Sequence, residues 1–291
     1  MYQALALAIV ASTALTVGLY FMKREAERLP SLDGGRRLRA WLAFVRDPWW
    51  MLGLALQIVG FALYLVALSA APLSIVHTAL NGGIALFVVL SVIGLGERVR
   101  PVEWLGVSII TVSLIVLSVS LAAAPSSNGV AHGMFPFSLA LLILSVLAVL
   151  VDPAPRRAIG LSVASGFLLG LGSVYAKGLA TTASLAAAVQ TAYLPLTLVA
   201  NLAGFVLMQA AFQAGRGVVV MPLFSMLSNL VPIIGGIVVF DESLPNHGTA
   251  AVLRPLAFAL AIVGAALLAG FGERPATPVT AVPQTEEARS R

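Results

Sequence analysis

Long apolar runs, separated by short polar stretches, follow one another along almost the whole chain. Each run is continuous and about 20 residues long, the length that an α-helix needs to cross the hydrocarbon core of a bilayer. Because only a helix or a closed barrel satisfies its own backbone hydrogen bonds in hydrocarbon, continuous runs predict membrane helices. The pattern allows a tenth span, but we expect nine, over residues 3–22, 48–70, 74–96, 102–122, 134–151, 159–180, 190–212, 217–240 and 251–271.

The composition excludes a soluble enzyme. Hydrophobic residues make up 59% of the 291 residues and charged residues only 10%, against about 25% charged in an ordinary soluble domain. The sequence contains no cysteine, and it lacks a P-loop, an H-E-x-x-H motif and a G-x-S-x-G motif. We therefore predict an all-α polytopic membrane protein that is not an enzyme and needs no cofactor.

Basic residues are distributed very unevenly between the two sides of the predicted membrane, which is a topology signal. Only Arg254 falls on one side, and Lys177 lies inside a span. The asymmetry predicts a multi-pass protein of the cell membrane with its N-terminus outside and its C-terminus cytoplasmic. Because the net charge of +5 comes from loops beside spans, we expect membrane lipids and no nucleic acid as partners. The basic residues of the predicted cytoplasmic side are Lys23, Arg24, Arg28, Arg36, Arg37, Arg39, Arg46, Arg98, Arg100, Arg156, Arg157, Arg216, Arg274, Arg289 and Arg291.

Two parts of the chain resemble each other. Phe61 to Glu97 matches Phe205 to Glu242 with a one-residue difference in length, and LYFMK ending at Lys23 matches SVYAK ending at Lys177. Since the fifth span lies between the two copies, they have opposite orientations, as in many secondary transporters. The predicted organisation is a first repeat over 1–122 with a basic cytoplasmic loop at 23–47, a linker with the fifth span over 123–158, a second inverted repeat over 159–271, and a disordered cytoplasmic tail over 272–291.

Residues 70–118 read AAPLSIVHTALNGGIALFVVLSVIGLGERVRPVEWLGVSIITVSLIVLS, an apolar helix that ends in Gly-Glu-Arg and is followed by a glycine-containing span. In this segment, and over nearly all of residues 1–271, the chain resembles the drug/metabolite transporter (DMT, EamA-like) superfamily. It is most similar in layout to the NIPA-type magnesium transporter family. The layout includes the basic loop after span one, the uninterrupted segment from Ala71-Pro72 to Glu97, and Tyr175-Ala176-Lys177-Gly178 in span six.

The resemblance implies transport of a small solute by alternating access, with a divalent cation such as magnesium as a candidate substrate. Two departures concern the substrate: Thr78 stands where the family tends to have proline, and Phe240-Asp241-Glu242 stands where a Lys-Glu pair is common. Export of small organic metabolites or amphiphiles is therefore an alternative. A non-transporting scaffold or lipid-binding subunit, whose basic loop contacts anionic headgroups, is an alternative of another class.

Lys177 is the most unusual residue of the predicted spans. A cation near the centre of a membrane helix costs roughly 2.5–3.5 kcal/mol on insertion scales and usually faces a cavity or a partner. Lys177 and the neighbouring Tyr175 are therefore candidates for the substrate pathway. The alternative is that Lys177 snorkels or binds a backbone carbonyl.

Polar residues of spans two, three and eight are further candidates for the pathway, because they need protein or water partners rather than lipid. Interhelical hydrogen bonds are the alternative explanation for them. The glycine pairs at 82–83 and 235–236, with Pro232, could break these helices and free carbonyls for a solute. The polar candidates are Gln57, His77, Asn81, Ser225, Ser228 and Asn229.

Carboxylates fall at helix ends rather than in mid-membrane. Glu97 and Glu242 lie at matched ends on opposite sides and are gate candidates; a solvated helix terminus is the alternative. Because magnesium normally binds one or two carboxylates and keeps several waters, a divalent ion would have to pass hydrated. We leave metal ligands unassigned. Gly106 and Gly264 in spans four and nine would permit close approach in a homodimer.

Overall fold

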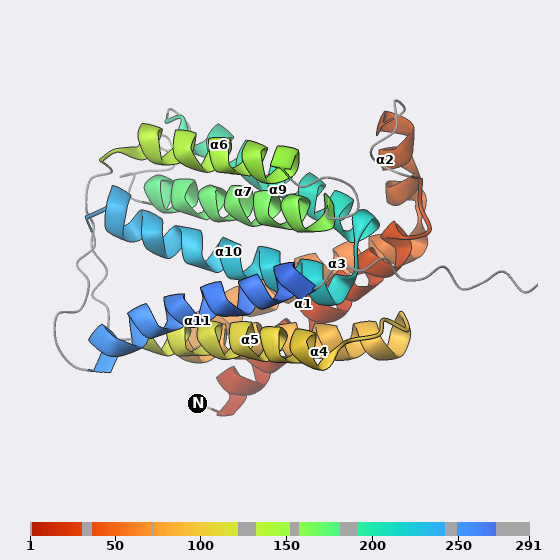
Figure 1. Cartoon of the computed structure of the whole chain (residues 1–291), viewed down its shortest axis with the longest axis horizontal. Coiled ribbons are helices and arrows are strands. Elements are labelled where there is room, and N and C mark those ends of the chain that lie inside the picture. Colours follow the sequence, from red (N-terminus) through yellow and green to blue (C-terminus); the bar gives the residue numbers. More distant parts are fainter. Residues whose placement is uncertain are drawn as a thin grey trace, which may run out of the picture.

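The computed structural model describes residues 2–30, 37–70, 73–121, 132–151, 157–180, 191–241 and 249–271. This part of the chain is all helical (Figure 1). Its helices are α1 (Tyr2–Ala26), α2 (Arg37–Arg46), α3 (Pro48–Ala70), α4 (Leu73–Gly94), α5 (Pro101–Leu121), α6 (Met134–Val151), α7 (Arg157–Ala180), α9 (Tyr193–Ala214), α10 (Gly217–Val239) and α11 (Thr249–Phe271).

Every predicted span coincides with a helix. Among the described residues, seven helices are long and apolar enough to cross a membrane, namely α1, α5, α6, α7, α9, α10 and α11. Within α3 and α4 the apolar segments found are shorter, Pro48–Tyr64 and Ala79–Gly94. Large apolar side chains lie on the outside of the bundle, such as Ile93, Phe135 and Leu150, each more than 70% exposed. The protein is therefore a polytopic helical membrane protein, as predicted.

Helix α2 lies in the segment that we predicted as a basic loop, residues 23–47. Trp41 and Phe44 fix it to the bundle: the Trp41 ring stacks on Phe205 of α9, and the Phe44 ring meets Trp50 of α3 edge to face. The prediction missed this helix because it has only 10 residues and carries arginines among its apolar residues.

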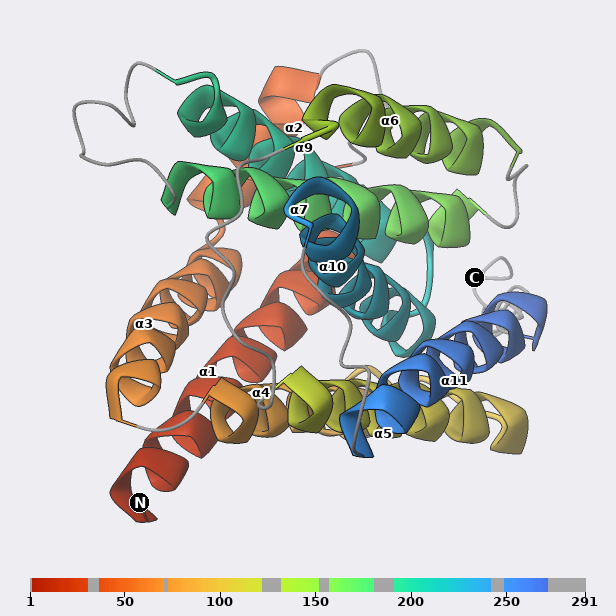
Figure 2. The ribbon, with the colours of Figure 1, turned by 90° about the vertical axis from the view of Figure 1, so that its left-hand side faces the viewer.

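The helices form two groups with α10 between them. Helix α1 packs against α3 and α4, and α7 packs against α9 and α10. Figures 1 and 2 show α6, α7 and α9 on one side of α10, and α1, α3, α4, α5 and α11 on the other. Helix α11 lies along α5, although residues 122–248 separate them in the chain. The C-terminal helix thus packs on the N-terminal group.

The α1–α3 and α7–α9 pairs make the same kind of close contact. A Cβ built on Gly60 of α3 would lie 2.8 Å from Cγ of Leu15, and one on Gly204 of α9 would lie 2.8 Å from Cγ of Leu169. Each helix pair therefore makes a close contact where a glycine faces a leucine, since any side chain at the glycine would overlap the neighbouring helix.

A second pair of contacts follows the same scheme. Gly18 of α1 faces the amide of Gln57 on α3, and Gly172 of α7 faces the amide of Asn201 on α9. In both cases a glycine makes room for a polar side chain of the next membrane helix.

Helices α4 and α10 run without the breaks that we expected at their glycine pairs and at Pro232. One glycine of each pair serves close packing instead: Gly83 faces Thr16 of α1, and Gly235 faces Val174 of α7. Pro232 lies inside α10, where neighbouring helices support a membrane helix that lacks one backbone hydrogen bond.

Gly106 and Gly264 do approach closely, but within one chain. A Cβ on Gly264 would lie 2.7 Å from Cγ1 of Ile110 and 3.0 Å from the Gly106 carbonyl oxygen. The contact predicted for a homodimer is thus made between α5 and α11 of the same chain, and it covers both glycines.

We expect Gly264→Ala to destabilise the protein, because the added methyl group overlaps Ile110 and the backbone of α5, and overpacking typically costs about 1–3 kcal/mol. Gly270→Ala, in the same helix, is the matched control, since nothing lies within 4 Å of a Cβ at Gly270. Thermal unfolding in detergent should show a lower midpoint for Gly264→Ala alone. Equal shifts in the two variants would contradict the assigned α5–α11 contact.

Candidate functional site

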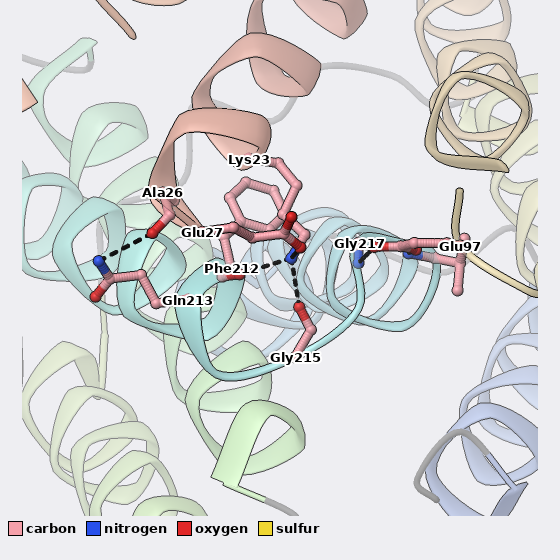
Figure 3. A network of polar contacts seen from close by, with 9 residues as sticks. Lys23, Ala26, Glu27, Glu97, Phe212, Gln213, Gly215 and Gly217 are labelled. Atoms are coloured by element: carbon pink, nitrogen blue, oxygen red, sulfur yellow. Dashed lines mark hydrogen bonds and ion pairs between the residues drawn. The ribbon is translucent and has the colours of Figure 1, made fainter. Parts of the chain in front are cut away.

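A buried lysine ties the end of α1 to the end of α9. Lys23 is 1% exposed. Its ammonium donates to the carbonyl oxygens of Phe212 and Gly215 at 2.7 and 2.6 Å, and to Oε1 of Glu27 at 2.6 Å (Figure 3). An ammonium has three donors, so all three are used.

The partners of Lys23 are groups that a helix cannot satisfy by itself. The last carbonyls of a helix lack intrahelical donors and carry the negative end of the helix dipole. Helix α9 ends at Ala214, so Phe212 and Gly215 belong to this end. The prediction that Lys23 is a loop residue was wrong, because Lys23 lies in the last turn of α1. Its charge can be buried there because its ammonium binds the last carbonyl groups of α9.

Gln213 makes the reciprocal contact from α9 to α1. Its Nε2 donates to the carbonyl oxygens of Ala26 and Pro30, each at 3.1 Å. Figure 3 shows Gln213 pointing toward Ala26 at the end of α1. The C-terminal ends of α1 and α9 therefore cap each other.

Glu97 holds the N-terminal end of α10. Its Oε1 accepts a hydrogen bond from the Gly217 N–H at 2.6 Å, and its Oε2 accepts one from the Val218 N–H at 3.0 Å (Figure 3). Arg216 is the N-cap residue of α10 and makes no side-chain cap bond of its own. A carboxylate from the loop after α4 thus supplies the cap, where the helix dipole favours negative charge.

Glu103 and Arg216 form an ion pair beside this cap. Glu103 lies in the first turn of α5 and is fully buried. One carboxylate oxygen accepts from the Arg100 N–H at 2.8 Å, and the other binds Nη2 of Arg216. Nη1 of Arg216 donates to the Arg98 carbonyl at 2.6 Å. The turn between α9 and α10 is therefore bound from α1, from α5 and from the loop between α4 and α5.

We refer to these five residues, Lys23, Glu97, Glu103, Gln213 and Arg216, as the helix-end clamp. Four of them carry charge, and each binds a helix terminus, another member of the group, or both. Most of their partners are backbone carbonyl and N–H groups at the ends of α1, α9 and α10. The clamp therefore joins the ends of α1, α9 and α10 to one another and to α5.

Lys177 and Tyr175 have different neighbours. Lys177 is half-buried in the last turn of α7, and its ammonium lies 4.6 Å from the centre of the Phe240 ring. Tyr175 is buried, and its hydroxyl donates to Oγ of Ser138 on α6 at 2.8 Å. Tyr175 therefore fastens α6 to α7, whereas Lys177 lies near the ends of α7 and α10.

Asn81 and Gln57 make hydrogen bonds between helices, the alternative that the sequence left open. Asn81 donates to the Leu114 carbonyl at 3.1 Å and to Oγ of Ser118 at 2.9 Å, both on α5. Gln57 donates to the Leu15 carbonyl on α1. Asn81 therefore joins α4 to α5, whereas Gln57 joins α3 to α1.

Ser225, Ser228 and Asn229 gather on one turn of α10. All three are half-buried. Nδ2 of Asn229 and Oγ of Ser228 donate to the Ser225 carbonyl at 2.7 and 3.0 Å. They are the predicted polar candidates that the fold brings together. The His77 side chain and Glu242 lie outside the described residues.

The described residues contain no group of three or more His, Cys, Asp or Glu side chains that could hold a metal ion. Away from the helix ends, the oxygens that the described spans offer come from hydroxyl, amide and backbone groups, because their carboxylates lie at helix ends. Such groups suit a hydrated ion or a polar molecule better than a dehydrated ion.

Four members of the clamp, Lys23, Glu103, Gln213 and Arg216, were not among the predicted site residues. The sequence held one signal for them, because Lys23 matches Lys177 in the repeat. A lysine that recurs at the end of both first helices is a reason to seek a role beyond topology.

Comparison with known proteins gives a distant homologue. The chain is 24% identical over 287 residues to an Arabidopsis thaliana protein named probable magnesium transporter NIPA9, and the match covers 92% of this chain and 82% of that protein. This confirms the resemblance at the level of a distant homologue. No family model matches the sequence, and no solved structure matches it.

Proposed function

We propose that this protein is a membrane transporter that moves a small solute by alternating access between two inverted halves. The observation that carries the proposal is the helix-end clamp, in which residues of the first half bind the turn between α9 and α10 of the second. The first half comprises residues 1–122, the second comprises 159–271, and α6 belongs to the linker over 123–158. In this state the clamp is the closed gate.

Matched contacts support the inverted repeat. The sequence spacing that relates Lys23 to Lys177 also relates Leu15 to Leu169. Leu15 faces Gly60 and Leu169 faces Gly204, two glycines that occupy the same place before the matched segments. The two halves would thus have the same internal contacts and opposite orientations. In this architecture one half can rock against the other.

The two ends of the bundle differ, as expected of one state in an alternating cycle. At the clamp end α1 contacts α9. Within the described residues, the corresponding helices of the other end, α7 and α3, make no comparable contact. The clamp end also carries Arg24, Arg28 and Arg98, which by the positive-inside rule supports its assignment to the cytoplasmic side.

The proposed solute is a divalent cation such as magnesium, taken through the membrane with part of its water shell. Similarity to a probable magnesium transporter supports this choice. Ser225, Ser228 and Asn229 are the proposed contact points, because their oxygens suit coordinated water. The Ser228 carbonyl also loses its helical donor, since Pro232, four residues later, has no N–H.

Glu97→Gln should reduce magnesium flux roughly tenfold, because the amide keeps one acceptor but loses the charge-assisted bond to the second N–H of α10. Flux is measured in proteoliposomes loaded with a magnesium-sensitive dye. Asp241→Asn is the matched control, since this carboxylate is 74% exposed and lies outside the clamp. It should leave the rate unchanged.

Wild-type protein that is folded but moves no magnesium would reject magnesium as the solute. The same vesicles would then be tested with labelled organic metabolites, beginning with anionic ones because of Lys177. Equal loss of flux in Glu97→Gln and Asp241→Asn would reject the clamp as the gate.

A further inference from the structure

We propose that Lys177 is the outer counterpart of Lys23: when the opposite end of the bundle closes, its ammonium binds the carbonyl groups in the last turn of α3. This inference rests on the proposed transport function. It gives Lys177 the role of a gate residue instead of a ligand inside the pathway.

The register of the two halves places Lys177 opposite this turn. The spacing between Gly18 and Gly172, both facing amides of the next helix, is the same as that between Lys23 and Lys177. For the partner helices, the spacing between Gly60 and Gly204 relates Leu68 to Phe212. Because Lys23 binds the Phe212 carbonyl, the equivalent acceptor for Lys177 is the Leu68 carbonyl.

Helix α3 offers Lys177 the same chemistry that α9 offers Lys23. It ends at Ala70, so the last carbonyls of this end, including that of Leu68, lack helical donors and carry the negative end of the helix dipole. Lys177 itself lies in the last turn of α7, as Lys23 does in α1. Each lysine is therefore carried by the end of one helix toward the carbonyl end of another.

The present contacts fit a state in which the first lysine is engaged across the halves. Lys23 reaches from the first half to α9, whereas the Lys177 ammonium lies over Phe240, next to the end of α10 in its own half. The contact of Lys177 with Phe240 is thus made within the second half and does not join it to the first.

This arrangement predicts that the two lysines have opposite effects on the equilibrium between the two conformational states. Rocking of the halves closes one end while it opens the other, so Lys23 stabilises one state and Lys177 stabilises the second. Removing either lysine should shift the population toward the state that the other lysine holds.

The experiment measures the distance between the ends of α3 and α7 by double electron–electron resonance, with the full chain in lipid nanodiscs. The sequence contains no cysteine, so Val66→Cys and Ala176→Cys, both exposed, carry the only spin labels. Lys177→Met should reduce the short-distance population roughly tenfold, and Lys23→Met should increase it by a similar factor. Arg46→Met, an exposed arginine outside the clamp, is the control for charge loss.

Opposite shifts in the two lysine variants, with none in Arg46→Met, would support the inference. A distance distribution that does not change in Lys177→Met, or that shifts in the same direction in both lysine variants, would overturn it. Magnesium flux in the same variants separates the two proposals. If magnesium is transported but Lys177→Met does not change the distance distribution, only the outer gate is rejected. A Lys177-dependent shift without flux supports the outer gate and rejects magnesium.

Discussion

Lys23→Met is expected to open the clamp end of the bundle to water-soluble reagents. The substitution removes the ammonium from the carbonyls of Phe212 and Gly215, and hydrogen bonds to charged groups contribute about 1.5–3 kcal/mol each. A net loss of about 3 kcal/mol shifts an equilibrium between closed and open ends roughly 100-fold. Separated helix ends can bind water instead, so the substitution costs the open state less than it costs the closed state.

The measurement is the labelling rate of Ala26→Cys by a membrane-impermeant maleimide. Ala26 is 1% exposed in the closed clamp, so labelling reports opening of the end. We expect Lys23→Met to accelerate labelling strongly, and Arg46→Met, which removes a charge outside the clamp, to leave the rate unchanged. Unchanged labelling in correctly folded Lys23→Met would show that Lys23 does not hold the end closed.

Lys23→Arg tests geometry at constant charge. The guanidinium is planar and presents its donors in a fixed fork, whereas Lys23 binds three oxygens around one small ammonium. An intermediate labelling rate is therefore expected. A rate equal to that of Lys23→Met would mean that the positive charge contributes little by itself.

The helices were predictable from sequence because hydrocarbon leaves the backbone few choices. The predicted span at 217–240 and the observed α10, Gly217–Val239, agree within one residue. The first span was predicted to end at 22, but α1 continues to Ala26. Three of these extra residues are charged, and contacts with α9 hold this end of α1, which hydropathy does not reveal.

The helix-end clamp was not predictable, because most of its partners are backbone groups. Lys23 binds carbonyls that lie 189 and 192 residues away in the chain, and Glu97 binds backbone N–H groups of α10. Every residue has such groups, so no pattern of side chains marks which of them will accept or donate. The sequence could only indicate that a charge lies at a helix end.

The sequence identified the polar residues within the spans, but not the directions in which their side chains point. Asn81 was a pathway candidate and instead donates to α5. A polar side chain in a membrane helix needs a partner, and a neighbouring helix satisfies this need as well as a solute does. Only the fold distinguishes the two, as it does for Ser225 and Asn229, which remain on one shared turn of α10.

Arg216→Met is expected to give the largest loss of stability among single substitutions in the clamp. Glu103 is fully buried, and removing its arginine leaves a carboxylate with the Arg100 N–H but without a compensating charge. Breaking a buried ion pair from one side typically costs about 3–5 kcal/mol. Thermal and denaturant unfolding in detergent should both show the loss, together with weaker attachment of the turn between α9 and α10.

The double substitution Glu103→Gln/Arg216→Met distinguishes an unpaired charge from a lost contact. A buried pair replaced on both sides is often nearly neutral, so the double variant should regain most of the stability. Arg28→Met is the matched control: Arg28 is 67% exposed and lies 3.7 Å from Glu25, and this buried carboxylate keeps its closer ion pair with Arg24 at 2.6 Å, so we expect a loss of at most about 1 kcal/mol. A double variant as unstable as Arg216→Met would instead mean that Arg216 acts mainly through the Arg98 carbonyl, and that the clamp depends on backbone capping more than on charge pairing.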